Sequence, residues 1–376
     1  MWAGMPLLPK EALERHDIDE VLTTKELKSG NSLVKMLSKQ QATVMVIKDR
    51  ADLAIFHSDD LEAHKPEIDY EWARKGIEAC RVVKDDHEVA MIRHANIVSS
   101  YAHEQVLASV KRAKNERELN AVFVMHCHAN GCREQAYGCI CASGTNASTL
   151  HYVHNDMPLS GRLNLLIDAG CEYNCYCSDI TRTFPLSGKW SKESKEVYEL
   201  VLHMQSECMK MVKAGVMWED CHMRAHTIAA DGLRALGIIN TDMTTEQILE
   251  SRITTRFFPH GLGHMLGMDT HDVGGNANYE DPNEFFAYLR IRGKLPAGAV
   301  VTNEPGIYFR KFPLEQELKD GKWDGVVDQE VLGRYWDVGG VRIEDDILVK
   351  EDGCENLTTV KSGWDYIEAA VNGEGA

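Results

Sequence analysis

Long hydrophobic runs are absent from this chain of 376 residues. No stretch reaches the roughly 18 consecutive apolar residues of a membrane span, and the N-terminal six residues lack the basic-then-apolar pattern of a secretory signal. Low-complexity tracts and repeats at solenoid spacing are also missing. We therefore expect a cytoplasmic protein, long enough for one large domain and a smaller one.

Positive charge is scarce. Lys and Arg total 41 against 58 Asp and Glu, which gives a formal net charge of -17. Such a surface repels polyanions, so we expect neither nucleic acid nor an anionic membrane as a partner. The surplus carboxylates include the ligand type that hard divalent cations require, although most are expected to be solvated surface groups.

A disulfide framework is not indicated. The eleven cysteines are odd in number, lie in apolar stretches and form no Cys-x-x-Cys pair, which favours reduced thiols in a core. One group of neighbouring thiols and imidazoles resembles a structural zinc site in composition. It comprises Cys127, Cys132, Cys139, Cys141, His126 and His128. Because its spacing is irregular, buried thiols are the favoured interpretation.

The first 82 residues are interpreted as part of an α/β domain. Residues 42–47 and 51–56 have the apolar pattern of buried strands. About 80 residues are few for a domain of this type, so we expect a shortened N-terminal domain that lacks its first strands.

Residues 83–376 are predicted to form a second, α+β domain. Four helices are expected: one from about 86 to 110 with an apolar face, one from Asn115 to Gly131 with Glu118 as capping-box partner, one around 197–211 and one from Trp218 to Gly237. Short β-prone runs follow at 165–167, 176–184, 300–302 and 341–343. This order indicates helices on one face of a largely antiparallel sheet. Residues 274–298 and 310–339 are predicted to be long loops that line a binding site.

Two aspartates stand out among the apolar strand residues. Asp168 ends the run 165–167, and Asp179 is predicted to lie within a second strand, on the same face as Cys177 and Thr181. A hairpin would bring the two carboxylates together. Carboxylates in apolar strands are costly unless they are paired or bind a metal.

Histidines and glutamates extend this set. His260, His264 and His271 occur within twelve residues among several glycines, which suggests a backbone fitted closely around a ligand. Glu304 and Glu344 each follow an apolar β-prone run. Four carboxylates and one imidazole suit two divalent ions, with Mn²⁺ the natural occupant and Zn²⁺, Co²⁺ or Fe²⁺ as alternatives.

With these acidic residues and histidines in this order, the sequence resembles the pita-bread metallopeptidases. The matching motifs are Asp168–Gly170, Ser178–Pro185, His260–His264, Asn303–Tyr308 and Arg342–Asp346. They occur in the family's order, within a resemblance that covers about residues 84–370. The stretch from His264 to Gly275 resembles the Xaa-Pro aminopeptidase and prolidase branch, rather than methionine aminopeptidase.

The resemblance implies a role for each matching residue. Asp179 and Glu344 would bridge two ions, Asp168 would bind one ion, and His264 and Glu304 the other. His151, His260 and His271 match residues around the substrate, and Arg342 and Tyr308 match supporting residues. Such ions acidify a bridging water and polarise the scissile carbonyl. Glu304 would shuttle the proton, and His271 or His151 would stabilise the oxyanion.

The expected activity is that of a Xaa-Pro aminopeptidase, a proline-specific metalloprotease that releases the N-terminal residue from peptides with proline in second position. A prolidase restricted to Xaa-Pro dipeptides is the alternative. A pita-bread binding module, or a metal-free relative acting on small amidines, is disfavoured because all five ligands are present. The family also leads us to expect a homodimer, and a longer N-terminal domain than this chain has.

Overall fold

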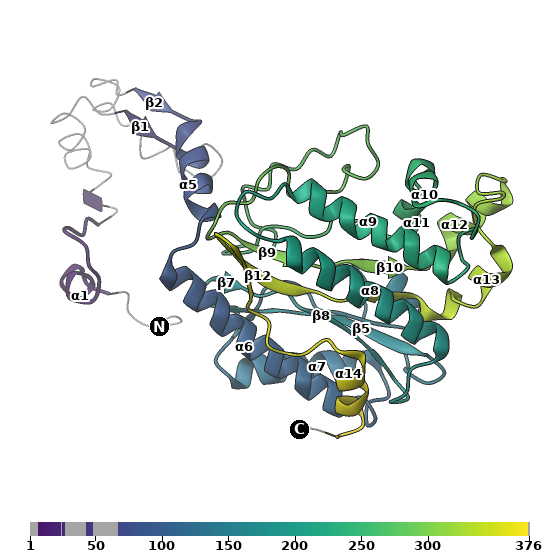
Figure 1. The fold of residues 1–376 in the computed structure, drawn as a ribbon. Coiled ribbons are helices and arrows are strands. Elements are labelled where there is room, and N and C mark those ends of the chain that lie inside the picture. The colour runs from purple at the N-terminus through teal and green to yellow at the C-terminus, as the bar shows by residue number, and fades with distance from the viewer. Residues whose placement is uncertain (1–6, 24, 27–42, 48–66, 375–376) are drawn as a thin grey trace. The chain divides into compact units, whose positions relative to one another are not determined.

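The computed structural model describes residues 7–23, 25–26, 43–47 and 67–374 (Figure 1). The chain divides into two compact units, residues 1–79 and 80–376. The boundary predicted from the sequence lies after residue 82, at the end of helix α5 (Trp72–Val82).

The smaller unit contains little described regular structure. Helix α1 spans Pro9–Arg15, and strand β1 (Val44–Met45) pairs in parallel with β2 (Ile68–Asp69). Residues 43–47 of the strand predicted at 42–47 are described, and of these Val44 and Met45 form a strand. The strand predicted at 51–56 lies outside the described residues.

Four long helices of the larger unit confirm the sequence prediction. They are α6 (Asp86–Ser109), α7 (Glu116–Ala129), α8 (Lys192–Met211) and α9 (Trp218–Ala235). Helices α6 and α7 pack on each other, as do α8 and α9. Helix α14 (Trp364–Val371) contacts both α6 and α8 and so links the two pairs.

Capping shows why two of these helices begin where they do. The Asp85 side chain accepts hydrogen bonds from the backbone N–H groups of His87 and Glu88, and Glu88 accepts one in return, which completes a capping box. The capping box predicted for α7 is wrong. Asn115 does cap that helix, but the Glu118 carboxylate accepts from the backbone N–H of Lys114 instead.

The strands of the larger unit lie in four small sheets. Their orders are β4-β5-β8, β3-β6-β7, β13-β12-β9 and β10-β11, and every described strand pair in this unit is antiparallel. The bounds are Glu134–Gln135 (β3), Ile140–Ser143 (β4), Asn164–Asp168 (β5), Cys171–Tyr173 (β6), Tyr176–Cys177 (β7), Thr181–Pro185 (β8), Val300–Asn303 (β9), Gly306–Tyr308 (β10), Gly340–Arg342 (β11), Asp345–Lys350 (β12) and Gly353–Asn356 (β13). Helices α6 and α7 contact β4, β6 and β7, whereas α8 contacts β9, β10, β11 and β13.

One of the two predicted loops is wrong. Residues 274–298 contain no helix or strand, as predicted. Residues 310–339, in contrast, contain α12 (Lys311–Lys319), α13 (Gln329–Gly333) and the 3-10 turn η3 (Trp336–Val338). Helix α12 forms because Leu314 and Leu318, one turn apart, are buried together beneath a charged outer surface. The remaining short helices are α10 (Thr245–Ser251), α11 (Thr254–Phe257) and the 3-10 turn η2 (Gly144–Ser148).

The cysteine cluster is a set of core thiols, as the favoured interpretation predicted. Cys127, Cys132, Cys139 and Cys141 are buried in the main hydrophobic core. Burial raises the pKa of Cys139 to about 12, which keeps its thiol protonated. Within the described part of the chain, these residues do not form a group that could hold a metal ion. Among the helices of the described residues, none has the length and apolar character needed to cross a bilayer.

Candidate metal centre and active site

A cavity of about 640 Å³ gathers nine of the site residues predicted from the sequence, all except Tyr308. The residues concerned are His151, Asp168, Asp179, His260, His264, His271, Glu304, Arg342 and Glu344. They come from segments up to 193 positions apart, counted from 151 to 344, so tertiary folding alone brings them to one place.

Asp168 and Asp179 reach the cavity through an interrupted hairpin. Asp168 ends β5 and pairs with Thr181 of β8. Asp179 does not lie within a strand, contrary to the prediction, but between β7 and β8, where the chain passes from one sheet to the next. This crossing requires Gly170, because a Cβ there would lie 1.8 Å from the carbonyl oxygen of Ser178. The backbone N–H of Asp179 donates to Asp346 (2.9 Å), which fixes the interruption.

The glycines around His264 allow its segment to pass close to β9. A Cβ on Gly263 would lie 2.0 Å from the carbonyl oxygen of Thr302, so the glycine at this position is required. The Thr302 hydroxyl accepts from the His264 backbone N–H (3.1 Å). The imidazole Nδ1 contacts the carbonyl oxygen of Met265 (2.9 Å) and therefore carries the proton, which leaves Nε2 free as a metal ligand.

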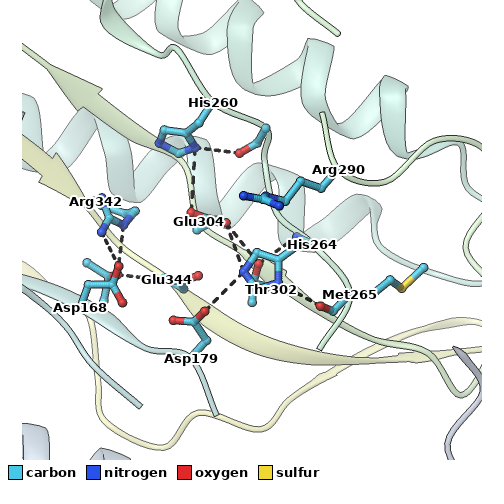
Figure 2. Close-up of polar contacts among 12 residues, drawn as sticks. Asp168, Asp179, His260, His264, Met265, Arg290, Thr302, Glu304, Arg342 and Glu344 are labelled. Atoms are coloured by element: carbon cyan, nitrogen blue, oxygen red, sulfur yellow. Dashed lines mark hydrogen bonds and ion pairs between the residues drawn. The ribbon is translucent and has the colours of Figure 1, made fainter. Parts of the chain in front are cut away.

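The glutamates lie just beyond strand ends rather than within strands. Glu304 follows β9, and Glu344 lies between β11 and β12, bridged to Thr181. His264 Nε2 lies 3.6 Å from a Glu304 oxygen and 3.3 Å from an Asp179 oxygen. The Thr181 hydroxyl donates to Glu344 (2.6 Å). Figure 2 shows the side chains of Asp179, His264, Glu304 and Glu344 pointing toward one another.

The electrostatics of this group fit a bound cation. Ligand atoms of Asp179, His264 and Glu344 all lie within 4.8 Å of one another. Burial, and then neighbouring carboxylates, raise the pKa values of Asp179 and Glu344 well above their usual range. Burial also raises the pKa of Glu304 to about 7. Buried carboxylates of one sign are costly without a counter-ion, and carboxylate oxygens with one imidazole are a donor set for divalent metals.

Arg342 organises the opposite side of the group. Its guanidinium forms an ion pair with Asp168 (2.5 Å) and donates to the hydroxyls of Tyr308 (2.9 Å) and Thr181 (3.1 Å). Since the Tyr308 oxygen accepts from Arg342, its own proton is directed to His260 Nε2, 2.8 Å away. Burial lowers the pKa of His260 to about 3, consistent with a neutral ring.

His271 and His151 occupy the cavity wall in different ways. The His271 ring packs edge-on against His264, with the ring centroids 4.4 Å apart. Burial lowers the pKa of His271 to about 3, so this imidazole is neutral near pH 7. His151 is exposed on the cavity wall.

Tyr137 contacts the group, although its sequence surroundings gave no signal. Its hydroxyl lies between Asp168 (2.6 Å) and Asp179 (2.5 Å) and donates its single proton to this pair. The residue lies between β3 and β4, in a segment without other acidic or histidine ligands. Only the folded structure brings it beneath the two aspartates.

Comparisons with known proteins agree on one family. Metallopeptidase family M24 matches residues 90–351. The chain is 50% identical over 380 residues to the probable Xaa-Pro aminopeptidase pepP of Talaromyces marneffei, covering 99% of this chain and 79% of the relative. It is 51% identical over 372 residues to a probable Xaa-Pro aminopeptidase of Fusarium vanettenii, with the same coverage.

Solved structures give the same fold. Proline aminopeptidase P II from Yersinia pestis superposes with a TM-score of 0.81 at 29% identity, covering 99% of this chain and 80% of that one. A zinc-substituted Escherichia coli aminopeptidase P in complex with product gives 0.82 at 28% identity, covering 99% and 79%. The expected pita-bread fold is thereby confirmed.

Proposed function

The chain belongs to metallopeptidase family M24, and we propose that it is a Xaa-Pro aminopeptidase that removes the N-terminal residue from peptides with proline in second position. The observation that carries this proposal is the convergence of four buried or half-buried carboxylates with His264 on one cavity wall. The names of the relatives supply the substrate class.

The proposed metal ligands are Asp168, Asp179, His264, Glu304 and Glu344. These residues would hold two divalent ions, most naturally Mn²⁺, and Asp179 and Glu344 would be available as ligands to both. Bound ions of this kind supply an activated water and polarise a carbonyl. The orientation of the ligands comes from the chain itself: Tyr137 and Arg342 hold Asp168, and Met265 fixes the tautomer of His264.

Glu304 is assigned to proton transfer. It is a half-buried carboxylate at the edge of the ligand group, 3.6 Å from His264 Nε2, where it can accept a proton and return it to the leaving prolyl nitrogen. Either His271, a neutral imidazole at the cavity wall, or His151 is assigned to donating a hydrogen bond to the developing oxyanion. His260 is assigned to positioning Tyr308, and Arg342 to positioning Asp168.

A prolidase, restricted to dipeptides, remains the alternative within the same chemistry. The cavity of about 640 Å³ lies within the range of about 300–1,000 Å³ typical of drug-sized ligands. That volume leaves room for residues beyond a dipeptide and favours the aminopeptidase. We further propose a cytoplasmic homodimer that acts on peptides rather than on nucleic acid or membranes.

The test begins with purified protein stripped by a chelator. Hydrolysis of an Xaa-Pro dipeptide and an Xaa-Pro-Xaa tripeptide is then measured with and without added Mn²⁺. We expect Mn²⁺-dependent cleavage, faster for the tripeptide, that is lost in Asp179→Asn and Glu344→Gln and retained in the exposed control Asp337→Asn. Intact substrates with folded, metal-loaded protein would refute the proposal, and exclusive dipeptide cleavage would establish the prolidase.

A further inference from the structure

Glu116 is a buried carboxylate that the proposed mechanism does not use. It is the first residue of α7 and is 0% exposed, and within the described part of the chain it forms no ion pair. A buried carboxylate without a cation is costly unless hydrogen bonds satisfy both of its oxygens. The N-terminus of a helix favours a negative charge, but this effect alone is small. The ionised form of Glu116 therefore depends on hydrogen-bond donors.

Five donors from one segment surround this carboxylate. One oxygen accepts from the Ser143 backbone N–H (2.8 Å), the Ser143 hydroxyl (2.5 Å) and the Asn146 amide (3.1 Å). The other oxygen accepts from the Tyr152 hydroxyl (2.8 Å) and the Met157 backbone N–H (3.0 Å). Burial alone would raise the pKa of Glu116, but the donors outweigh burial and lower the pKa. The carboxylate is thus ionised near pH 7.

The two sets of donors lie on either side of His151 in the sequence. Ser143 and Asn146 precede this histidine, at the end of β4 and in η2, and the other set begins with Tyr152, the next residue. Residues 149–157 contain no helix and no strand. One carboxylate therefore ties both ends of an irregular segment to the start of α7.

Other contacts fix the residues around His151 but not its side chain. The Tyr152 ring is buried in a small hydrophobic cluster that includes Tyr308. The Asn155 side chain accepts from a backbone N–H of β4 (2.7 Å) and so closes the segment on its other side. The His151 side chain is exposed on the cavity wall. Its position is consequently set by the backbone on either side of it.

We propose that Glu116 is a positioning residue that holds His151 at the active-site cavity through both ends of the segment 143–157. The assignment rests on the proposed function, which uses His151 at the cavity wall for the reaction. A hydrogen-bond donor contributes to such a reaction when it is held in place beforehand. If Glu116 instead only stabilised the fold, the effect of replacing it would not depend on His151.

A double-mutant cycle tests this dependence. Hydrolysis of Ala-Pro-Ala by Mn²⁺-loaded protein is measured for Glu116→Gln, His151→Ala and the double variant. Gln replaces one accepting oxygen by an NH₂ donor that faces other donors, so kcat should fall about 10-fold or more, with KM within about 2-fold. In the His151→Ala background the same change should alter kcat by less than about 2-fold. Equal factors in both backgrounds, or an unchanged kcat in either single variant, would overturn the proposal.

Two further variants separate positioning from a loss of folding. Tyr152→Phe removes one hydroxyl and keeps the ring in its cluster, so kcat should fall by a smaller factor, about 3-fold. That loss should also disappear in the His151→Ala background, and this cycle decides the matter if Glu116→Gln does not fold. Glu118→Gln makes the same substitution at an exposed carboxylate two residues further along α7 and should leave kcat unchanged.

The position of His151 can also be observed without turnover. Histidine-labelled protein is loaded with Zn²⁺, because paramagnetic Mn²⁺ would broaden nearby NMR signals, and the His151 ring signal is assigned by its loss in His151→Ala. Glu116→Gln should shift or broaden this signal. His222, whose ring contacts the Phe285 carbonyl oxygen outside this segment (2.8 Å), should keep its own signal.

The spectrum distinguishes the two proposals from each other. An unmoved His151 signal in Glu116→Gln, or equal changes at His151 and His222, would overturn the positioning role. If the wild type cleaves no Xaa-Pro peptide, the proposed function fails, and the spectrum still decides whether Glu116 positions His151.

Discussion

Replacing Lys84 by Met is expected to destabilise the larger unit strongly, because it breaks a buried ion pair. Lys84 Nζ lies 3.0 Å from an Asp272 oxygen, and each side chain is only 1% exposed. Removing one partner of a buried pair costs about 3–5 kcal/mol. Arg81 also contacts Asp272 (2.5 Å) and remains in the variant, so we expect a loss near the lower limit, about 3 kcal/mol.

The same pair is linked to the site by the backbone. The Asp272 N–H donates to the carbonyl oxygen of Met265 (2.8 Å), which also contacts His264 Nδ1. A displaced Asp272 should therefore reduce peptidase activity as well as stability. His271 precedes Asp272 directly and should move with it.

The assay is urea unfolding of chelator-treated protein, so that metal binding does not contribute to the measured free energy. The double variant Lys84→Met/Asp272→Asn should recover part of the loss, because it no longer leaves a buried carboxylate with one partner missing. Lys192→Met is the control, since its pair with Glu196 is 3.9 Å long and Lys192 is largely exposed; it should cost less than about 1 kcal/mol. A Lys84→Met loss as small as that of the control would refute the reasoning.

Three further changes probe the site itself. Tyr137→Phe removes the hydroxyl that donates to Asp168 and Asp179, and it should weaken metal affinity about 10-fold or more in a metal titration; an unchanged affinity would contradict this role. Folding raises the pKa of Glu304 from 4.5 to about 7, so the folded state binds this proton more tightly than the unfolded state. The free energy of unfolding of chelator-treated protein should therefore fall as pH rises from about 4.5 to 7. Glu304→Gln should flatten that part of the profile, and an identical slope in the variant would contradict it. Gly263→Ala should displace the strand contact of its segment and abolish metal binding, whereas Gly353→Ala, with nothing within 4 Å of the added Cβ, should not.

Local patterns were enough to predict the long helices and the candidate ligands. Helix α6 was predictable because its apolar residues recur at helical spacing and Asp85 begins it with a capping box. Asp168, Glu304 and Glu344 were predictable because an acidic residue next to an apolar β-prone run is unusual. The glycines near His264 led us to expect a backbone fitted around a ligand, and the structure shows that Gly263 is needed for a close approach to the Thr302 backbone of β9.

Errors arose where tertiary packing decides the local structure. Asp179 alternates with Cys177 and Thr181 as in one strand, yet the chain changes sheets between them. That change depends on Asp346, which lies 167 positions away in the sequence and accepts from the Asp179 N–H. The short helix α12 was missed because only Leu314 and Leu318 are buried in it, and two residues give too weak a period to detect.

The groups that hold the ligands could not be predicted for a related reason. A metal ligand carries a chemical signature in its own residue type, but a supporting residue acquires its role only from what lies beside it in space. Tyr137 is an ordinary tyrosine until the hairpin places Asp168 and Asp179 at its hydroxyl. The orientation of the metal ligands therefore depends in part on a residue that carries no signal in the sequence alone.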